Sequence, residues 1–357
     1  MTNLPGWLQA ILLQLITAAE PAAATPATAP APSSTQIFWL LGVVIGLLAI
    51  AYAVSVLLKR YPEGTLNPAL VERFIHRIRI WWIMCAILVA GFLLGRAATV
   101  ILFGAVSFWS LREFITTTPT RRGDHRTLFW VFFGFTPLQY VLVGITRDLY
   151  GLYSIVIPVY AFLYIPARIA FAGDPKRFLE RSAKIQAGLF ICVYALSFAP
   201  ALLHLPLTRL DGVPWGRDSH LANAGLLFYL ILLTQLADMF QHLWSRLLGR
   251  RVIAPEVSAT RTWEGFLGGV TSTTLIGALL WWATPFRFWE AACMSMIVAV
   301  TAFAGNMVMS AIKRDRGVAD FGTLVQGHPG VLDRIDSICF AAPVFYHLTR
   351  YFFSALA

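Results

Sequence analysis

The sequence predicts an all-α protein, a polytopic bundle of about ten transmembrane helices with its candidate active-site loops in the cytoplasm. Three observations support this fold class. The 357 residues are 58% hydrophobic and only 13% charged, with a mean hydropathy of +0.68, which is more apolar surface than one soluble core could bury. Apolar segments of membrane-crossing length follow one another along the chain. Basic residues cluster in every second connecting loop.

Residues 1–36 are predicted to form a flexible segment outside the cytoplasm. The stretch from Glu20 to Ser34 consists mainly of Ala, Pro, Thr and Ser, and it cannot bury enough apolar surface to fold. A short apolar piece, Trp7–Ile16, precedes this stretch without the basic residues that open a secretory signal peptide. The Ala-rich sequence that follows leaves its cleavage open.

Apolar segments after Gln36 are long enough, or nearly so, to cross about 30 Å of hydrocarbon. The ten segments are Ile37–Leu58, Ile80–Leu94, Ala97–Leu111, Leu128–Ile145, Leu152–Ala170, Ile185–Leu203, Leu221–Met239, Phe266–Ala283, Phe288–Ile312 and Ile338–Phe353. The least distinct boundary is Gly95-Arg96, where two short segments meet. We therefore divide the remainder of the chain into N-terminal transmembrane helices, residues 37–220, and a C-terminal transmembrane region, residues 221–357, that contains the candidate active site.

Basic residues alternate from loop to loop. The rich loops contain Lys59, Arg60, Arg73, Arg77 and Arg79; Arg112, Arg121, Arg122 and Arg126; Lys176, Arg177, Arg181 and Lys184; Arg246, Arg250, Arg251 and Arg261; and Lys313, Arg314, Arg316 and Arg334. The other loops contain Arg96, Arg147, Arg209, Arg217 and Arg287. The positive-inside rule therefore places the rich loops in the cytoplasm and both termini outside it, in a multi-pass protein of the inner (cytoplasmic) membrane. This pattern accounts for the net charge of +10, so no nucleic acid partner is expected.

Carboxylates gather in the loop from Ser310 to Asp336, where a purely structural membrane scaffold would need only basic residues. Asp333 and Asp336 are three residues apart, so both side chains can project from one face of a helix start. Mg²⁺ prefers oxygen ligands and is usually held by one or two carboxylates together with substrate phosphates. The competing interpretation is that Asp333 caps the last helix, which is worth about 1 kcal/mol, and that Asp336 complements the helix dipole.

Other residues of this loop have two interpretations each. Lys313 and Arg314 can complement the partial negative charge at the end of a helix or bind phosphate. Asp320 can be a solvated loop residue or part of the site. His328 lies in the sequence Gly-His-Pro-Gly, where a turn residue is equally expected.

A second loop, Asp238–Glu264, also contains carboxylates. An acid at a membrane edge, such as Asp238, costs a few kcal/mol unless it is paired or hydrated, so it suggests a function. A salt bridge to Arg246 is the alternative. Thr262 and Glu264 can equally be helix-capping residues before the next span.

The loop from Ser310 to Asp336 resembles the signature of the phosphatidate cytidylyltransferases, also called CDP-diacylglycerol synthases. That signature has a Ser, then Lys-Arg three residues on, then Lys-Asp after a four-residue gap, then His-Gly-Gly and Asp-Arg-x-Asp. The corresponding residues here are Ser310, Lys313, Arg314, Asp320, Gly327–Gly330, Asp333, Arg334 and Asp336, with every gap matched. A second family motif, Ser-Pro-Lys-Lys-Thr-x-Glu-Gly, resembles Ser258–Gly265, and the family's upstream acid falls on Asp238.

The sequence departs from the family pattern at several positions. Ala319 and Pro329 stand where the family has Lys and Gly, and Ala259-Thr260 replaces Pro-Lys. Asn306 occupies the position, seven before Lys313, where many bacterial members have a metal-binding Asp. These changes reduce the cationic and metal-binding capacity that the family pattern provides.

The resemblance implies transfer of a cytidylyl group from CTP to phosphatidate at the cytoplasmic membrane face, giving CDP-diacylglycerol and pyrophosphate. It implies Mg²⁺ held by Asp333, Asp336 and Asp238, with or without a monovalent cation. The residues expected to act in catalysis are Asp320, Asp333, Asp336, Lys313 and Arg334. Those expected to bind substrate are Ser310, Arg314, His328, Arg261, Thr262, Glu264 and Ser258. The expected partners are CTP, phosphatidate or a related lipid phosphate, membrane lipids, and a second copy of the chain in a homodimer.

Two other functions stay open at this point. The first is CTP-dependent activation of a different lipid phosphate, which differs only in the acceptor. The second is a non-catalytic, lipid-binding paralogue, which the replacements at Asn306, Ala319 and Pro329 suggest. A transporter would show paired charges near the bilayer midplane and broken helices in corresponding halves, and neither stands out in this sequence.

Overall fold

The computed structural model describes residues 42, 45–46, 49, 82, 85–118, 120–145, 149–209, 212, 214–215, 220–318, 320–322 and 330–354. The predictions for residues 1–36 lie outside these residues, as does most of the predicted span Ile37–Leu58. His328 and two of the departures from the family pattern, Ala319 and Pro329, are also outside the described residues.

The predicted boundary at Gly95 is a real break between two helices. A short apolar helix, Cys85–Leu94, precedes it, and helix α4, Arg96–Thr117, follows it. The φ angle of Gly95 is 102°, which residues with a side chain rarely adopt. The hydroxyl of Thr99 donates to the Gly95 carbonyl in the first turn of α4. Glycine at this position therefore allows the chain to change direction between the two segments.

Each of the next three spans combines α-helix with a π-helical stretch. The first span consists of α5 (His125–Trp130), η2 (Val131–Phe135) and α6 (Thr136–Ile145), and the short helix η1 (Arg122–Asp124) precedes it. The second span consists of α7 (Tyr150–Ile155), η4 (Val156–Ala161) and α8 (Phe162–Ala170). The third span consists of α9 (Phe178–Leu189), η5 (Phe190–Ala195) and α10 (Leu196–Ala201), and the short helix η6 (Leu202–His204) follows it. The π-helical stretches are η2, η4 and η5. Such stretches often occur at functional sites.

The third of these spans is anchored at its start by a buried ion pair. Arg181 of α9 and Asp124 of η1 pair with side-chain exposures of 5% and 1%. Arg181 also donates to the backbone carbonyls of Asp174 and Lys176. Breaking a buried pair leaves an uncompensated charge at a cost of about 3–5 kcal/mol, so this network fixes the start of α9 against the preceding loop.

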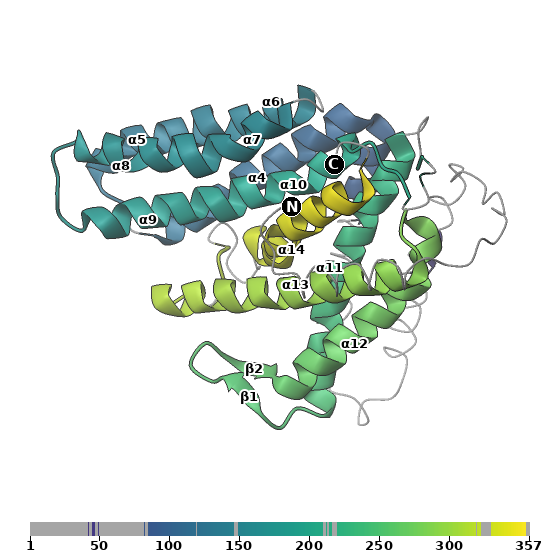
Figure 1. Ribbon diagram of the computed structural model, residues 1–357. Helices are drawn as coiled ribbons and strands as arrows, with labels where there is room; N and C mark the ends of the chain where they lie inside the picture. Colours follow the sequence, from purple (N-terminus) through teal and green to yellow (C-terminus); the bar gives the residue numbers. More distant parts are fainter. Residues whose placement is uncertain are drawn as a thin grey trace, which may run out of the picture. The chain divides into compact units, whose positions relative to one another are not determined.

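The described part of the C-terminal region contains four long helices and one hairpin. Its elements are α11 (His220–Leu247), β1 (Val252–Ala254), β2 (Ser258–Thr262), α12 (Trp263–Leu279), η7 (Trp281–Ala283), α13 (Phe288–Arg316) and α14 (Leu332–Phe353). Helix α14 packs against α13 and α11 on one side, and against α10, α4 and η5 on the other (Figure 1). It therefore joins the C-terminal helices to the N-terminal ones.

The β1–β2 hairpin is a small addition to a predominantly helical fold, and the sequence analysis did not predict it. The two strands are antiparallel and pair Val252 with Thr262 and Ala254 with Ser258. A three-residue turn connects them, and the backbone N–H of Val257 donates to the carbonyl of Ala254 across it. The short strands are rich in β-branched residues, which favour extended backbone, but they are too short to give a distinct pattern in a sequence dominated by helices.

Two glycines allow α11 and α12 to approach closely. A Cβ atom on Gly265 would lie 1.8 Å from the hydroxyl of Ser245, and one on Gly269 would lie 2.3 Å from the side chain of Gln241. The two glycines are four residues apart and therefore share one face of α12. Small residues at this spacing let the backbones of membrane helices pack together.

Six helices in the described part of the chain are long and apolar enough to cross a membrane: Arg96–Thr117, Arg122–Ile145, Tyr150–Ala170, Phe178–His204, Asn223–Leu247 and Phe288–Arg316. They coincide with six of the predicted spans, so a helical membrane protein is confirmed. Two further predicted spans are the helices α12 and α14, which are not among the six, and the count of ten stays a prediction.

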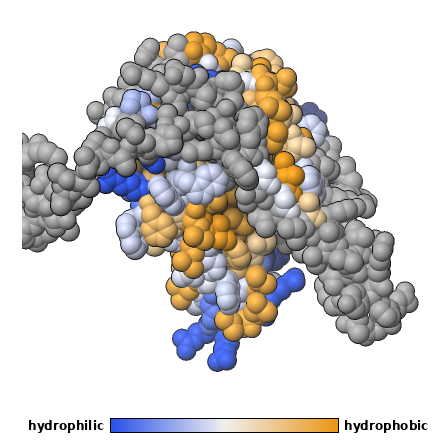
Figure 2. All heavy atoms as spheres, turned by 90° about the vertical axis from the view of Figure 1, so that its right-hand side faces the viewer, coloured by the Kyte–Doolittle hydropathy of each residue, from blue (hydrophilic) through white to orange (hydrophobic). Residues whose placement is uncertain are grey.

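Hydrophobic side chains cover much of the outer surface. Leu163, Leu275 and Phe133 are each more than 60% exposed on their helices, as expected of residues that face lipid. Figure 2 shows such side chains gathered on one face, with hydrophilic residues at its lower end, which is the level of the β1–β2 hairpin in Figure 1.

A carboxylate cluster and its basic neighbours

Two aspartates from different helices meet at the hydroxyl of Ser337. The hydroxyl oxygen of Ser337 lies 2.5 Å from Oδ2 of Asp238 and 3.2 Å from Oδ1 of Asp336. Asn306 of α13 completes the group because its amide N–H₂ contacts both Asp238 and Ser337. Helices α11, α13 and α14 therefore each contribute side chains to one cluster, Asp238, Asn306, Asp336 and Ser337, which we call the carboxylate cluster.

The carboxylate cluster is suited to a divalent cation. Asp336, Asn306 and Ser337 are buried and Asp238 is half-buried, and two carboxylates that share one hydroxyl in such surroundings repel each other unless a proton or a cation lies between them. Among the described residues no three His, Cys, Asp or Glu side chains are grouped as metal ligands. Two carboxylates match Mg²⁺, which takes its remaining ligands from water and substrate phosphates.

Asp333 has other hydrogen-bond partners than the residues of the carboxylate cluster. Its Oδ1 forms a 3.0 Å salt bridge with Lys313, and its Oδ2 accepts hydrogen bonds from the backbone N–H groups of Phe321 and Gly330 at 2.9 and 3.1 Å. Asp333 and Asp336 were expected to converge because of their spacing, but in this structure they have different partners. Asp333 holds the segment before α14 and orients Lys313.

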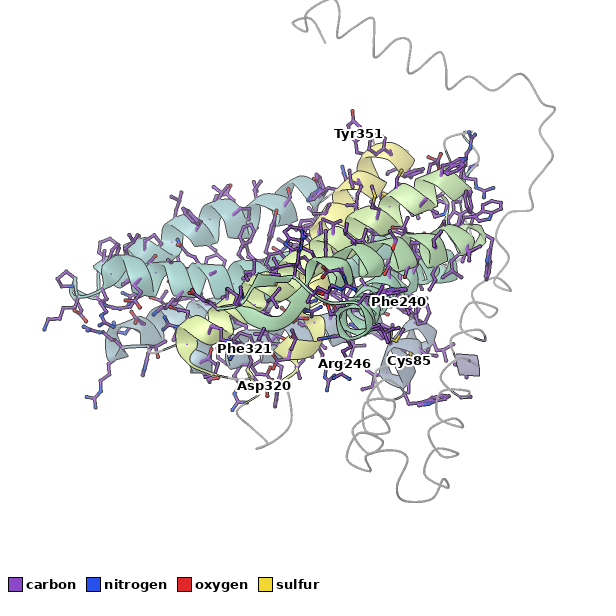
Figure 3. All side chains as sticks on the ribbon, turned by 90° about the horizontal axis from the view of Figure 1, so that it is seen from below. Cys85, Phe240, Arg246, Asp320, Phe321 and Tyr351 are labelled. Carbon is purple, nitrogen blue, oxygen red and sulfur yellow. The ribbon has the colours of Figure 1, made fainter. Side chains whose placement is uncertain are left out.

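The basic residues at the end of α13 lie beside this segment. The Lys313 ammonium is 5.8 Å from the ring centroid of Phe321, and Arg314 donates to the backbone carbonyl of Val257 in the hairpin. Ser310 is half-buried one turn earlier on the same helix, and Asp320 is exposed. Figure 3 shows Asp320, Phe321 and Arg246 along one side of the protein and Tyr351, near the end of α14, on the opposite side.

The hairpin and the start of α12 bring together the other predicted substrate-binding residues. Thr262 is the N-cap of α12, and its hydroxyl accepts from the backbone N–H of Gly265 and donates to Ser245. The capping interpretation of Thr262 is thus confirmed. The side chain of Arg261 is buried and donates to Oε1 of Gln241 at 2.9 Å, and the hydroxyls of Ser258 and Thr260 are 3.4 Å apart.

Glu264 links the two ends of the hairpin. Its Oε2 accepts from the backbone N–H groups of Arg250 and Arg251 at 3.1 and 3.2 Å. These hydrogen bonds stabilise the charged form and hold the pKa of Glu264 below its usual value. Glu264 therefore stays ionised at neutral pH and fixes the entry to the hairpin.

Glu113 and Ser337 are parts of the site that the sequence analysis missed. Glu113 is 3% exposed on α4, and its carboxylate accepts from the backbone N–H groups of Val331 and Leu332 at 3.1 and 2.8 Å. It therefore caps α14, which has no side-chain cap of its own. The sequence contained one signal for Glu113, because an acid at the end of an apolar segment suggests a function. Ser337 carried no signal, because serine is common beside helix starts.

Of the remaining predicted residues, Arg334 is half-buried in the first turn of α14, where its backbone carbonyl accepts from Gln235 at 3.4 Å. The site therefore combines an acidic pair, the buried Asp336 and the half-buried Asp238, with basic side chains at one end of the helices. Such a site can bind a metal ion together with a phosphate-containing ligand and stabilise charge that moves between phosphates.

Comparisons with known proteins agree with this chemistry. Residues 75–352 match the cytidylyltransferase family. The chain is 37% identical over 282 residues to the uncharacterised protein YnbB of Escherichia coli (strain K12), covering 77% of this chain and 87% of that protein. It is 34% identical over 152 residues to a phosphatidate cytidylyltransferase of Synechocystis sp., covering 42% of this chain and 51% of that protein. It is 33% identical over 184 residues to one of Mycobacterium leprae, covering 50% and 53%. The alignments with these two enzymes thus span about half of their length.

Proposed function

This chain belongs to the cytidylyltransferase family, as its signature residues predict, and from that premise we propose that it makes CDP-diacylglycerol from CTP and phosphatidate. Family membership and the relatives named phosphatidate cytidylyltransferase support CTP-dependent nucleotidyl transfer to a lipid phosphate. The observation that carries the proposal in this chain is the carboxylate cluster beside the Lys313–Asp333 pair. We propose phosphatidate as the acceptor because two of these relatives are named phosphatidate cytidylyltransferase.

In the proposed reaction, a phosphate oxygen of phosphatidate attacks the α-phosphorus of CTP. The new P–O bond forms while the bond between the α-phosphorus and the bridging oxygen to the β-phosphate breaks, and pyrophosphate leaves. The attacking oxygen is already anionic, so the reaction needs no strong general base. The protein must instead bring two anionic substrates together and neutralise charge on the leaving group.

We assign Asp238 and Asp336 to holding Mg²⁺, because their carboxylates face one another across Ser337. Bound Mg²⁺ would neutralise phosphate charge and orient the leaving group. Asn306 and Ser337 keep the two carboxylates in position. Asp333 holds Lys313 toward the phosphates, and its contacts with Phe321 and Gly330 keep the segment before α14 in place.

The other predicted residues take supporting roles in this proposal. Arg314, Arg334 and Asp320 lie in the segments around the acidic pair and would contact CTP or its metal. Ser310 and Ser258 would bind substrate. Arg261, Thr262 and Glu264 position the hairpin through contacts with Gln241, Ser245 and the Arg250–Arg251 backbone. CTP is water-soluble and the basic loops follow the positive-inside rule, so we place the site at the cytoplasmic face of the inner membrane.

The test is formation of pyrophosphate and CDP-lipid by the purified protein with CTP, phosphatidate and Mg²⁺. We expect Asp336→Asn and Asp238→Asn each to lower kcat by about a hundredfold or more, the range lost when charge stabilisation is removed from a transition state. Asp315→Asn is the matched control, because Asp315 is an exposed acid that pairs with Arg316 near the same helix end. Full activity in either cluster variant would contradict the metal assignment.

A different lipid phosphate as acceptor is the second candidate function. Asn306 hydrogen-bonds to Asp238 at a position where many bacterial members of the family have an Asp, so the carboxylate cluster has one carboxylate fewer than theirs. A panel of lipid phosphates offered with CTP to the same preparation separates the candidates. Turnover of another acceptor in preference to phosphatidate would favour this second function, and CTP binding without turnover of any acceptor would favour a non-catalytic lipid-binding protein.

A further inference from the structure

A second polar cluster lies toward the other end of α14 from the carboxylate cluster. Its members, which we call the tyrosine–arginine cluster, are Tyr150 and Tyr153 of α7 and Tyr346, His347 and Arg350 of α14. Arg350 is fourteen residues after Asp336, which is about 21 Å along the helix axis. None of the residues proposed above for catalysis or substrate binding belongs to this cluster.

Aromatic contacts hold the members of the tyrosine–arginine cluster in place. The guanidinium carbon of Arg350 lies 3.6 Å from the centroid of the Tyr150 ring, and the Tyr150 hydroxyl is 3.2 Å from Nδ1 of His347. The hydroxyls of Tyr153 and Tyr346 hydrogen-bond to each other. Because a guanidinium that stacks on an aromatic face presents its N–H groups as a planar fork, Arg350 is oriented in advance for an anion.

Arg350 has no acidic partner in the part of the chain that the structure describes. None of the salt bridges there includes it, and it interacts electrostatically with Tyr153, Tyr346 and His347. A charged residue within a membrane span is costly unless it is paired, and it suggests a function. Arg350, His347 and Tyr150 are half-buried, so a ligand can reach the charge. An anion is the partner that this cluster fits.

The surroundings of Arg350 are those of a membrane interface. Tyr351 and Phe352, the next two residues, are 68% and 53% exposed, and exposed aromatic residues gather at the level of the lipid head groups. On α7, Leu152 and Ile155 are 42% and 40% exposed, and their spacing of three residues places them on one apolar face. The anion at hand in such surroundings is a lipid phosphate.

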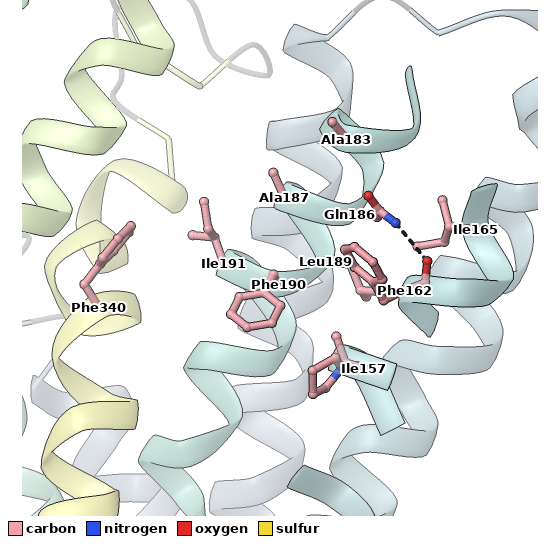
Figure 4. Close-up of a pocket in the computed structure, with 11 residues that line it drawn as sticks. Ile157, Phe162, Ile165, Ala183, Gln186, Ala187, Leu189, Phe190, Ile191 and Phe340 are labelled. Carbon is pink, nitrogen blue, oxygen red and sulfur yellow. Dashed lines mark hydrogen bonds between the residues drawn. The ribbon is translucent and has the colours of Figure 1, made fainter. Parts of the chain in front are cut away.

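An apolar groove lies farther along the seam between the same spans. The groove has a volume of about 600 Å³ and lies between η4–α8, α9–η5 and α14 (Figure 4). Helix α7 continues directly into η4. Phe340, which lines the groove, is seven residues before His347, so the two share a face of α14 about 10 Å apart along the axis. Polar groups at one end of a seam and apolar groups farther in match an amphipathic ligand.

We propose that the tyrosine–arginine cluster binds the phosphate of an anionic phospholipid in the leaflet opposite the carboxylate cluster. Arg350 pairs with the phosphate, and Tyr150 and His347 supply further hydrogen-bonding groups beside it. The described residues place no carboxylate there to pair with the ammonium of a zwitterionic head group, which favours a head group with net negative charge. A lipid about 21 Å from the carboxylate cluster is not the acceptor of the proposed reaction, so this proposal stands apart from that reaction.

The test is lipid binding by the full-length protein in detergent after its own lipids are removed. Native mass spectrometry gives Kd for dioleoyl phosphatidylglycerol and for dioleoyl phosphatidylcholine, which have the same chains. We expect Arg350→Gln to weaken binding of phosphatidylglycerol about tenfold, the loss typical of a hydrogen bond to a charged group. Arg287→Gln is the matched control, because Arg287 is an exposed arginine at the same predicted membrane face, and it should change Kd less than about twofold.

Three outcomes would overturn the proposal. The first is an equal loss of binding in Arg350→Gln and Arg287→Gln, and the second is equal affinity of the wild type for the two lipids. The third is competition by inorganic phosphate or glycerol 3-phosphate as strong as that by the lipid, which would indicate a site for a soluble anion.

A second pair of variants serves if Arg350→Gln does not fold. Tyr150→Leu removes the ring beneath the guanidinium and should weaken phosphatidylglycerol binding, whereas Tyr160→Leu removes an exposed tyrosine of η4 and should not. Equal binding by these two variants would also contradict the proposal. None of these measurements uses turnover, so a protein that makes no CDP-lipid would fail the proposed function alone.

Discussion

Asn306 is the residue whose chemistry most directly distinguishes this site from its family pattern. Its amide donates to the carboxylate of Asp238 and to the hydroxyl of Ser337, which an Asp in the same place could not do when ionised. The replacement therefore exchanges a charge for a hydrogen-bond donor. It keeps Asp238 in position without a cation but leaves less negative charge with which to bind one.

We predict that Asn306→Asp makes stability depend on Mg²⁺. The variant loses a donor and places a third carboxylate in the cluster, so the free energy of unfolding should fall by about 1–3 kcal/mol without the metal. Added Mg²⁺ should raise the thermal midpoint of the variant in detergent more than that of the wild type, because binding to the native state stabilises it.

Asn223→Asp provides the matched control for this measurement. Asn223 is also buried on α11, and its amide donates to the carbonyls of Leu203 and Leu205. This variant should be destabilised without recovery in Mg²⁺. If Asn306→Asp shows no more recovery than Asn223→Asp, the carboxylate cluster does not bind the metal.

At the scale of elements, the contact between α11 and α12 determines where the hairpin residues lie. Gly269 packs against Gln241, and Gln241 accepts from the buried side chain of Arg261. A change in the separation of α11 and α12 therefore moves Gln241, the residue that holds Arg261. The hairpin follows, since it connects the same two helices.

We predict that Gly269→Ala lowers the free energy of unfolding by about 1–3 kcal/mol, because the added Cβ would lie 2.3 Å from the side chain of Gln241 and the helices must separate. The check is thermal denaturation in detergent. Gly151→Ala is the control, since nothing lies within 4 Å of a Cβ there, and alanine in a helix is neutral or slightly stabilising. A midpoint for Gly269→Ala equal to that of Gly151→Ala would show that the close approach is unimportant.

At the scale of the whole molecule, the proposal requires the signature residues to face the cytoplasm. The alternating basic loops predict this orientation, and α13, with 29 residues, is long enough to cross a membrane. Asp315, at the end of α13, and Arg287, just before its start, should therefore lie on opposite faces of the membrane.

We predict that a membrane-impermeant maleimide labels Arg287→Cys in intact cells and Asp315→Cys only after the cells are broken open. Both residues are exposed, and each variant is made in a chain whose four native cysteines are replaced. Labelling of Asp315→Cys in intact cells would place the signature residues outside the cytoplasm, where CTP is not supplied. It would contradict both the predicted topology and the proposed function.

The sequence by itself determined the membrane class, most of the long helices and the residues that carry the family signature. Apolar length and charge alternation act locally along the chain, so the spans around α4, α11 and α13 could be predicted from their own residues. Membership of the family could also be predicted, because gapped motifs such as Ser310–Asp336 need no knowledge of packing. The break at Gly95 was visible as a boundary for the same reason.

Only the tertiary structure decided which of these residues meet. Spacing alone placed Asp333 and Asp336 together, but Asp336 shares the hydroxyl of Ser337 with Asp238 from α11, while Asp333 is held by Lys313 and two backbone N–H groups. Glu113 caps a helix that begins more than two hundred residues later, and the groove is lined by three separate spans. These contacts depend on how helices pack across long sequence separations, which local periodicity and charge do not encode.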